Sequence, residues 1–259
     1  MTVTIYNAAG LIGTTYSGQM AKFQQFDTVR RFFNHKLKHT FGVSSLILDI
    51  MLSEKSIASY ITDDVKKMVD ISAILHDIGR FYQFDENGEF IPNHIFHHGQ
   101  KSVDLIKDMP EFNNPMILFA IISHDNIAID YTSEYYTNLS DNDKKIADIM
   151  AKLLRDADKL ENMRNFVVNG APKYKILKTE PLSEDVKHFI RNKTLVDRRF
   201  VKTSADMIAD LILWVNDINF NATKDIIKRI NYLEVSINEF SKCGASKEDV
   251  ELVREMVTI

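Results

Sequence analysis

A histidine and an aspartate stand side by side at the end of a strongly apolar segment of the chain. Residues 71–75 are nearly all apolar, and His76 and Asp77 follow them directly. Burying a carboxylate is costly unless a positive partner is present. A divalent cation is such a partner, and imidazole with carboxylate suits Mn, Fe, Co, Ni or Zn, with Mg also possible. Adjacent helical residues point about 100° apart, so both reach one ion only at a frayed helix end, which we expect Gly79 to supply.

Other segments carry further side chains of the types that bind metals. His98 precedes Ser102 by one helical turn, so both lie on one face of a helix. His124 ends an apolar run in the same way that His76 ends its own. His39 and Asp158 each lie on a helix with an apolar stripe. Any one of these residues alone fits a core or capping role, and only their combination indicates a metal site.

The ordered set of His39, His76 with Asp77, and Asp158 resembles the HD superfamily of metal-dependent phosphohydrolases. The segment 75–80 is similar to the central motif of that family, in which Lys usually stands where this chain has Arg80. The segment 157–160 is similar to the closing motif, and the resemblance spans about residues 25–165. It implies a helical bundle with a metal at its centre. The ligands that it implies for the first ion are His39, His76, Asp77 and Asp158.

The resemblance leaves the number of metal ions open. In some relatives a histidine at the place of His98 binds a second ion, and in others it contacts the substrate phosphate. His124 is similar to a further ligand of the members with two ions. In a two-ion site Asp77 would bridge ions about 3.5–4 Å apart, which clamp the attacking hydroxide and the leaving oxygen. In a one-ion site His98 would instead act as a general acid on the phosphate. His97 adjoins His98, and the spacing to Ser102 favours His98.

Two cations and a second aspartate adjoin the motifs. Arg80 and Lys159 each directly follow a motif, and either is suited to contact a substrate phosphate or to be an ordinary solvated charge. Together with Asp77 and His98 they are the candidate catalytic residues. Asp156 and Asp158 are about 200° apart on an ideal helix, and helical phase does not choose between them. The resemblance selects Asp158, because the family motif places Lys or Arg directly after the ligand.

Apolar residues recur at steps of three and four from about Met20 onward, which predicts helices, and strand signals are scarce. Residues 1–19 hold a short β-prone run and three glycines, so we expect an extended segment or a loose tail there. Residues 20–165 are expected to form the metal-binding helical core. Residues 166–259 are expected to add helices packed on that core within the same domain. The predicted fold is all-α, an HD-domain helical bundle with additional C-terminal helices.

Composition excludes several other classes of protein. The chain has 259 residues, 45% of them hydrophobic and 26% charged, which is typical of a soluble globular protein. The net charge of −4 argues against a general nucleic-acid binder. We expect no signal peptide and no membrane segment, because no apolar run approaches the ~18–20 residues that cross a bilayer. The single cysteine, Cys243, fits a reducing compartment, so we expect a cytoplasmic protein.

The resemblance implies a metal-dependent phosphohydrolase that cleaves a small-molecule phosphate ester, and we expect a nucleotide as the substrate, although its exact identity stays open. A nucleotide monophosphate, a dinucleoside polyphosphate, a cyclic nucleotide and a non-nucleotide ester all remain. The absence of a Gly-Tyr-Pro segment after the site argues against the cyclic-di-guanylate phosphodiesterases. The main alternative is a metal-stabilised ligand-binding or regulatory module without hydrolase activity. A di-iron oxygenase is a third hypothesis, because a few HD relatives use two irons for oxidation. Residues 166–259 either shape the pocket or form a homodimer interface.

Overall fold

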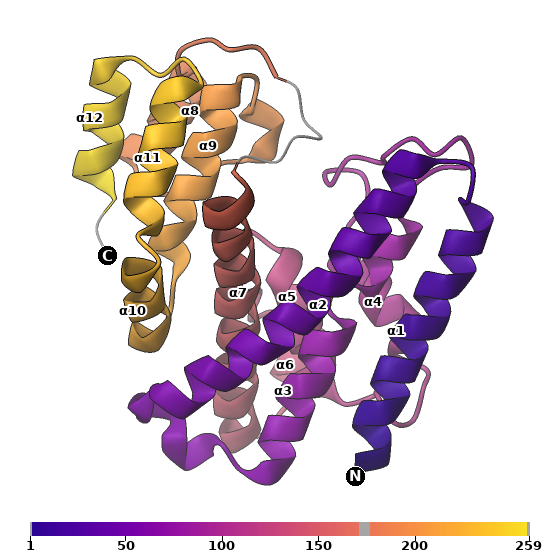
Figure 1. Cartoon of the computed structure of the whole chain (residues 1–259). Helices are drawn as coiled ribbons and strands as arrows, with labels where there is room; N and C mark the ends of the chain where they lie inside the picture. Colours follow the sequence, from indigo (N-terminus) through magenta and orange to yellow (C-terminus); the bar gives the residue numbers. More distant parts are fainter. Residues whose placement is uncertain (1, 171–176, 258–259) are drawn as a thin grey trace. The chain divides into compact units, whose positions relative to one another are not determined.

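The regular structure of the protein is helical (Figure 1). The computed structural model describes residues 2–170 and 177–257. Within these ranges, β-structure is limited to the isolated bridges Phe84–Phe90 and Lys178–Thr203. The prediction of an all-α fold is therefore confirmed.

The α-helices are α1 (Thr2–Lys22), α2 (Asp27–Ser53), α3 (Asp63–Leu75), α4 (His98–Ile106), α5 (Pro115–Asp125), α6 (Glu134–Thr137), α7 (Asp141–Asn169), α8 (Glu184–Arg191), α9 (Ser204–Leu213), α10 (Asn221–Arg229), α11 (Tyr232–Lys242) and α12 (Lys247–Met256). Short 3₁₀ helices connect them at η1 (Lys55–Tyr60), η2 (Ile78–Tyr82), η3 (Arg198–Phe200) and η4 (Trp214–Asp217).

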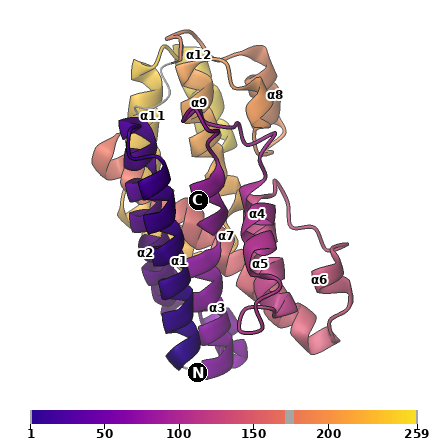
Figure 2. The same ribbon diagram turned by 90° about the vertical axis from the view of Figure 1, so that its right-hand side faces the viewer.

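The chain divides into two compact units, unit 1 (Met1–Asp158) and unit 2 (Lys159–Ile259). The boundary falls inside α7. In unit 1, α3 packs against α1, α2 and α5, while α4 packs against α5 and η2 (Figure 2). The expectation that the C-terminal residues share one domain with the core stays a prediction.

Local sequence explains where the helices of unit 1 begin. Thr62 is the N-cap of α3, as the sequence predicts, and its hydroxyl accepts a hydrogen bond from the backbone N–H of Val65 at 3.3 Å. Asn114 caps α5 by accepting from the N–H of Met116 at 2.9 Å, and Pro115 occupies the first helical turn, where its missing N–H costs nothing. These caps fix the starts of the two helices whose C-terminal ends place His76 and His124.

The prediction of an extended segment at residues 1–19 is wrong, because Thr2–Lys22 form helix α1. Glycines and β-branched residues disfavour a helix when they are judged by intrinsic propensity. In the folded protein, however, Ala8 and Ile12 are fully buried one turn apart, and α1 packs along α3. Burial of that face outweighs the weak propensity, as is common for helices in proteins.

The role that the sequence suggests for Gly79 is also wrong. Helix α3 already ends at Leu75, and Gly79 lies inside η2, outside the set of glycines with positive φ. The absence of a side chain matters for another reason: a Cβ atom at Gly79 would overlap the carbonyl oxygen of His98 and lie 2.9 Å from the backbone nitrogen of Ser102. Gly79 therefore allows the start of α4 to approach the His76–Asp77 turn closely.

We expect Gly79→Ala to lower the free energy of unfolding by about 1–3 kcal/mol, because the added methyl group has no space. Gly13→Ala is the matched control, since a Cβ at Gly13 in α1 meets nothing within 4 Å. This control should raise stability by about 0.8–1 kcal/mol through helix propensity. Chemical denaturation of both variants measures the difference, and equal stabilisation by both substitutions would contradict the close approach at Gly79.

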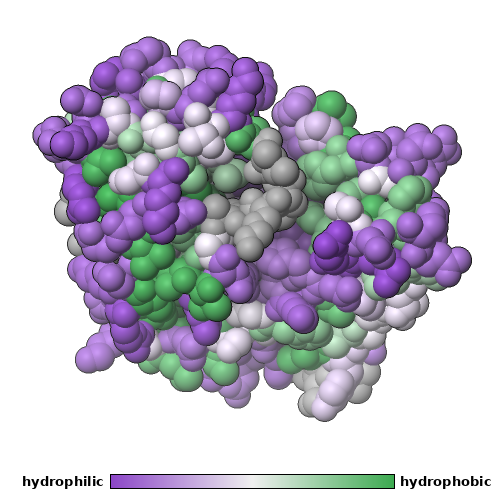
Figure 3. Space-filling model, turned by 45° about the horizontal axis from the view of Figure 1, so that its top comes forward, coloured by the Kyte–Doolittle hydropathy of each residue, from purple (hydrophilic) through white to green (hydrophobic). Residues whose placement is uncertain are grey.

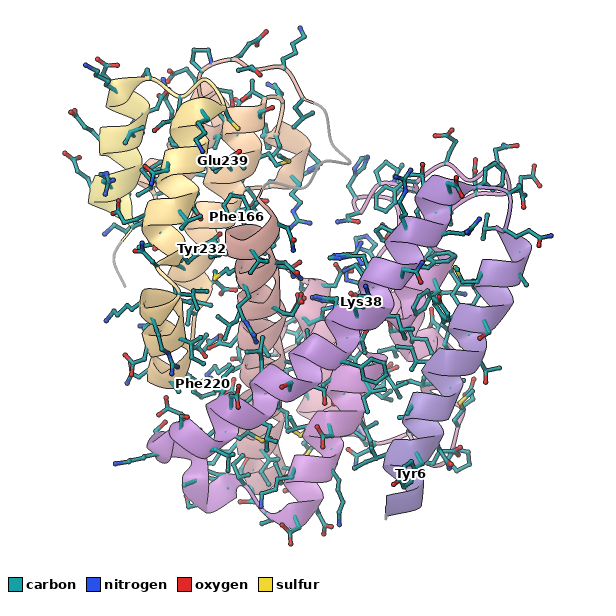
Figure 4. All side chains as sticks on the ribbon, in the orientation of Figure 1. Tyr6, Lys38, Phe166, Phe220, Tyr232 and Glu239 are labelled. Atoms are coloured by element: carbon teal, nitrogen blue, oxygen red, sulfur yellow. The ribbon has the colours of Figure 1, made fainter. Side chains whose placement is uncertain are left out.

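Unit 2 has its own buried core. Tyr232 is buried, its hydroxyl donates to the carbonyl of Leu211 at 2.7 Å, and its ring lies beside that of Phe166 with centroids 6.1 Å apart (Figure 4). Capping boxes open α9 at Thr203 and α12 at Ser246. Unit 2 is therefore organised by local helix signals of the same kind as unit 1.

Hydrophilic residues occupy much of the surface seen in Figure 3, and hydrophobic patches interrupt them. The large apolar side chains that are exposed include Leu52 and Val168. None of the described helices combines the length and the apolar character that crossing a bilayer requires.

Candidate metal centre

Asp77 lies at the centre of a buried histidine cluster in unit 1, and each of its carboxylate oxygens faces different imidazole nitrogens. Oδ2 lies 3.6 Å from Nε2 of His76 and 3.7 Å from Nε2 of His39. Oδ1 lies 3.3 Å from Nε2 of His98 and 3.6 Å from Nε2 of His124. One carboxylate therefore separates the four histidines into two pairs, which we call the Oδ2 half and the Oδ1 half of the site.

Asp158 completes the Oδ2 half. Its Oδ1 atom lies 2.9 Å from Nε2 of His39, which brings α7 to α2. His39, His76 and Asp158 form one group whose ligand atoms are close enough to share a metal ion, and His76, Asp77 and His124 form another. His76 belongs to both groups, and the second group takes one histidine from each half. His98 belongs to neither group and joins the site through its contacts with Asp77 and His124. The structure thus brings together all six side chains that the sequence proposes as ligands.

His76 and His124 are oriented by the same local device. Each lies at the end of an apolar helix and donates its Nδ1 proton to the carbonyl three residues earlier, His76 to Ala73 at 2.7 Å and His124 to Ile121. A histidine whose Nδ1–H is used in this way presents the lone pair of Nε2 to the other side of the ring. The sequence motif of an apolar run ending in histidine therefore fixes both the position and the tautomer of the ring.

The Oδ1 half brings two imidazole nitrogens and a carboxylate oxygen together beside the Arg80 guanidinium, whose Nε lies 3.4 Å from Oδ1 of Asp77. Nε2 of His98 and Nε2 of His124 lie 3.1 Å apart. Nδ1 of His98 lies 2.8 Å from Oδ1 of Asp125, and when that nitrogen carries the ring proton, both Nε2 atoms present lone pairs. Two facing lone pairs beside a carboxylate oxygen repel one another unless a cation is shared among them.

The buried atoms of the cluster fit a divalent metal ion. Nε2 of His76 and Oδ1 of Asp77 are buried and make no hydrogen bond within the described part of the chain. Leaving such atoms unsatisfied costs about 1–3 kcal/mol each, and metal coordination removes that cost. The donors are imidazoles and carboxylates, which favours Mn, Fe, Co, Ni or Zn over an ion that prefers only oxygen.

Burial keeps the rings of His76 and His98 neutral. It lowers the pKa of His76 to about 4, and burial together with the nearby Arg80 guanidinium lowers the pKa of His98 to about 3. At neutral pH both rings are therefore unprotonated at one nitrogen, which is the form that binds metals. A neutral His98 does not suit the one-ion alternative, in which this residue must supply a proton.

The two carboxylates of the cluster stay ionised. Burial raises the pKa of Asp77, but the Lys36 ammonium and the His76 ring hold it well below its usual value. Burial raises the pKa of Asp158, but the hydrogen bond from His39 and the proximity of the His39 and His76 rings together lower it well below its usual value. Both groups therefore carry negative charge across the physiological pH range, as metal ligands must.

Two cations contact Asp77, one at each oxygen. Nζ of Lys36 lies 2.7 Å from Oδ2, and Nε of Arg80 lies 3.4 Å from Oδ1. The Arg80 guanidinium also donates to Gln83 at 2.6 Å and to Asn93 at 2.9 Å. Asp77, Gln83 and Asn93 thus hold Arg80 within unit 1. Its contact with a substrate phosphate stays a prediction.

Ser102 decides which of the two neighbouring histidines enters the site. Its hydroxyl proton is shared between the carbonyls of His76 at 2.7 Å and His98 at 2.9 Å, and its oxygen accepts from the N–H of Gly79 at 2.9 Å. These bonds fix the first turn of α4 against the end of α3. His98 is consequently buried in the cluster, whereas His97 is exposed at the N-cap of α4.

Neither candidate metal group contains Lys159, His35, His94 or His188. Nζ of Lys159 lies 2.8 Å from Oδ2 of Asp217, both in unit 2, so its predicted role toward phosphate stays a prediction. The rings of His35, His94 and His188 are exposed. Among the described residues, the histidines of the candidate metal groups are His39, His76 and His124.

Sequence reasoning missed three residues that hold the cluster together. Lys36 lies one helical turn before His39, and that spacing was the available signal. Asp125 directly follows His124, and it contacts His98. Arg155 is buried and donates to the carbonyls of Ser123 at 2.7 Å and Asn126 at 2.6 Å, which secures the end of α5. Nothing in the sequence near Arg155 indicates that role.

Asp158 is the aspartate of α7 that reaches the cluster. It contacts His39, whereas Asp156 is fully buried and belongs to neither candidate metal group. We therefore expect Asp158→Asn to lower activity by at least about a hundredfold, because a bound metal ion stabilises the transition state by several kcal/mol. Asp156→Asn should cost less. Turnover and metal content of the two purified variants test this order, and the reverse order would assign the ligand to Asp156.

Comparison with known families agrees with this arrangement. A family model for the HD domain matches residues 37–163, a range that contains all six candidate ligands. This protein belongs to the HD superfamily, whose domains bind divalent metals. No curated protein and no solved structure matches the chain.

Proposed function

We propose that this protein is a metal-dependent phosphohydrolase that cleaves a phosphate ester, and that its substrate is a nucleotide. The observation that carries the proposal is the division of the cluster by Asp77. Each carboxylate oxygen faces its own pair of imidazole nitrogens. That arrangement suits two ions bridged by one carboxylate, which is a recurring solution for phosphate ester hydrolysis.

The chain's own residues have distinct parts in this proposal. His39, His76 and Asp158 would hold one ion with Oδ2 of Asp77, and His98 and His124 would hold the other with Oδ1. When bound, divalent ions lower the pKa of water and neutralise charge that develops on the phosphate oxygens. Burial of the cluster keeps bulk water away from the imidazoles and strengthens every electrostatic contact among these groups.

A metal-dependent ester screen tests the proposal. The purified protein is analysed for bound metals, stripped with a chelator, and reloaded with Mn, Co or Ni. It is then offered nucleoside monophosphates, dinucleoside polyphosphates, cyclic nucleotides and simple phosphate esters. We expect hydrolysis that disappears with the metal and returns with it. A protein that binds metal but hydrolyses none of these esters would instead be a metal-stabilised module, and one that consumes oxygen would be an oxidase.

A further inference from the structure

His98 cannot be oriented in the way that His76 and His124 are. Those two rings end helices and donate to the carbonyl one turn earlier in the same helix. His98 is the first residue of α4, so no helical turn precedes it. Its Nδ1 instead lies 2.8 Å from Oδ1 of Asp125, a residue of another helix.

Asp125 contacts two consecutive residues at the start of α4. While its Oδ1 faces His98, its Oδ2 accepts the backbone N–H of Gly99 at 3.2 Å. A Cβ on Gly99 would come 2.9 Å from the Cβ of Asp125, so glycine permits this approach. Asp125 thus offers one carboxylate oxygen to each of two nitrogens at the start of α4, and an ionised carboxylate acts only as an acceptor.

We propose that Asp125 is a positioning residue for the Oδ1 half of the metal site. Its carboxylate holds the proton on Nδ1 of His98, and Nε2 is thereby left as a lone pair directed at Oδ1 of Asp77 and at His124. The proposal rests on the proposed function, because it assigns this half of the site to the second ion. The contacts that carry the proposal are those of Asp125 with His98 and Gly99, both at the start of α4.

Asparagine at this position tests the idea with almost no change of shape. Its amide has one oxygen for two donors, Nδ1–H of His98 and N–H of Gly99. If the NH₂ group faces His98, the ring must carry its proton on Nε2 and cannot bind a metal there. If the NH₂ group faces Gly99, two donors oppose each other and the start of α4 is displaced.

The experiment measures metal binding and does not depend on turnover. Stripped protein is titrated with Mn, and the number and affinity of bound ions are measured for the wild type and Asp125→Asn. We expect the wild type to bind about two ions and the variant to bind its second ion roughly 10–100-fold more weakly. Asp148→Asn is the matched control, because that carboxylate accepts from Tyr131 at 2.6 Å outside the cluster, and it should bind like the wild type.

A double variant separates positioning from a general role in folding. In the His98→Ala background, Asp125→Asn should change neither the number of bound ions nor their affinity, because its target is gone. A further loss of metal in that background, or unchanged Mn binding by Asp125→Asn alone, overturns the proposal. A wild type that binds no metal at all would instead contradict the proposed function, so the two failures are distinguishable.

Discussion

Asp77→Asn is expected to abolish metal binding at both halves of the site and to reduce phosphate ester hydrolysis below detection. The reason is that both carboxylate oxygens of Asp77 face ligand nitrogens, so one substitution affects both pairs of histidines. A neutral amide also no longer balances the charge of Lys36, whose side chain is only 12% exposed. Removing one partner of such a buried pair costs about 3–5 kcal/mol, so the metal-free variant should also be less stable.

Elemental analysis and thermal unfolding of Asp77→Asn measure the two effects separately. Asp104→Asn is a suitable control, because that exposed carboxylate pairs with Lys107 on α4 and not with the cluster. The control should retain metal, activity and stability. Full metal content in Asp77→Asn would rule out Asp77 as a ligand, whatever its activity.

The second large effect is expected for His124→Ala, which should lower metal content from about two ions per chain toward one. His124 contributes to the Oδ1 half, where its Nε2 lies 3.1 Å from that of His98, while Asp158 and His39 lie in the other half. Loss of one ion removes several kcal/mol of transition-state stabilisation, so turnover should fall at least about a hundredfold.

His97→Ala provides the comparison, because it removes an exposed imidazole that lies next to the site in sequence but outside the cluster. It should leave metal content and turnover unchanged. If the wild type holds a single ion and His124→Ala keeps it, the one-ion alternative is correct. His98 would then have to act on the phosphate, although burial keeps its ring neutral near pH 7.

The six candidate ligands were predictable as a set because their motifs, in their order along the chain, resemble those of the HD superfamily. His76 and His124 each follow an apolar run that forms a buried helix, and the end of that helix places the ring. The choice of His98 over His97 followed from the spacing to Ser102, whose hydroxyl indeed bonds to the His98 carbonyl. Whether these residues hold metal is a separate question that the proposed experiments address.

The features that the sequence did not predict depend on contacts between distant segments. Helix α1 forms because Ala8 and Ile12 are buried against other helices, and propensity alone does not reveal such a partner. The contact of Lys36 with Asp77 requires the register of α2 against the end of α3. The bonds from Arg155 to the end of α5 likewise depend on how α7 lies beside it. The alignment of these helices depends on three-dimensional packing, and the periodicity of the sequence does not predict it.

The way in which the rings are held also implies an order of assembly. The first N–H groups of any helix lack partners within that helix, and Gly99 supplies one of them in α4. Its hydrogen bond to Asp125 forms only when α4 has docked on α5. The exchange rate of this single amide with deuterium therefore reports docking directly. His76 and His124 acquire their orientation as soon as α3 and α5 are helical, whereas His98 acquires it only with the tertiary fold.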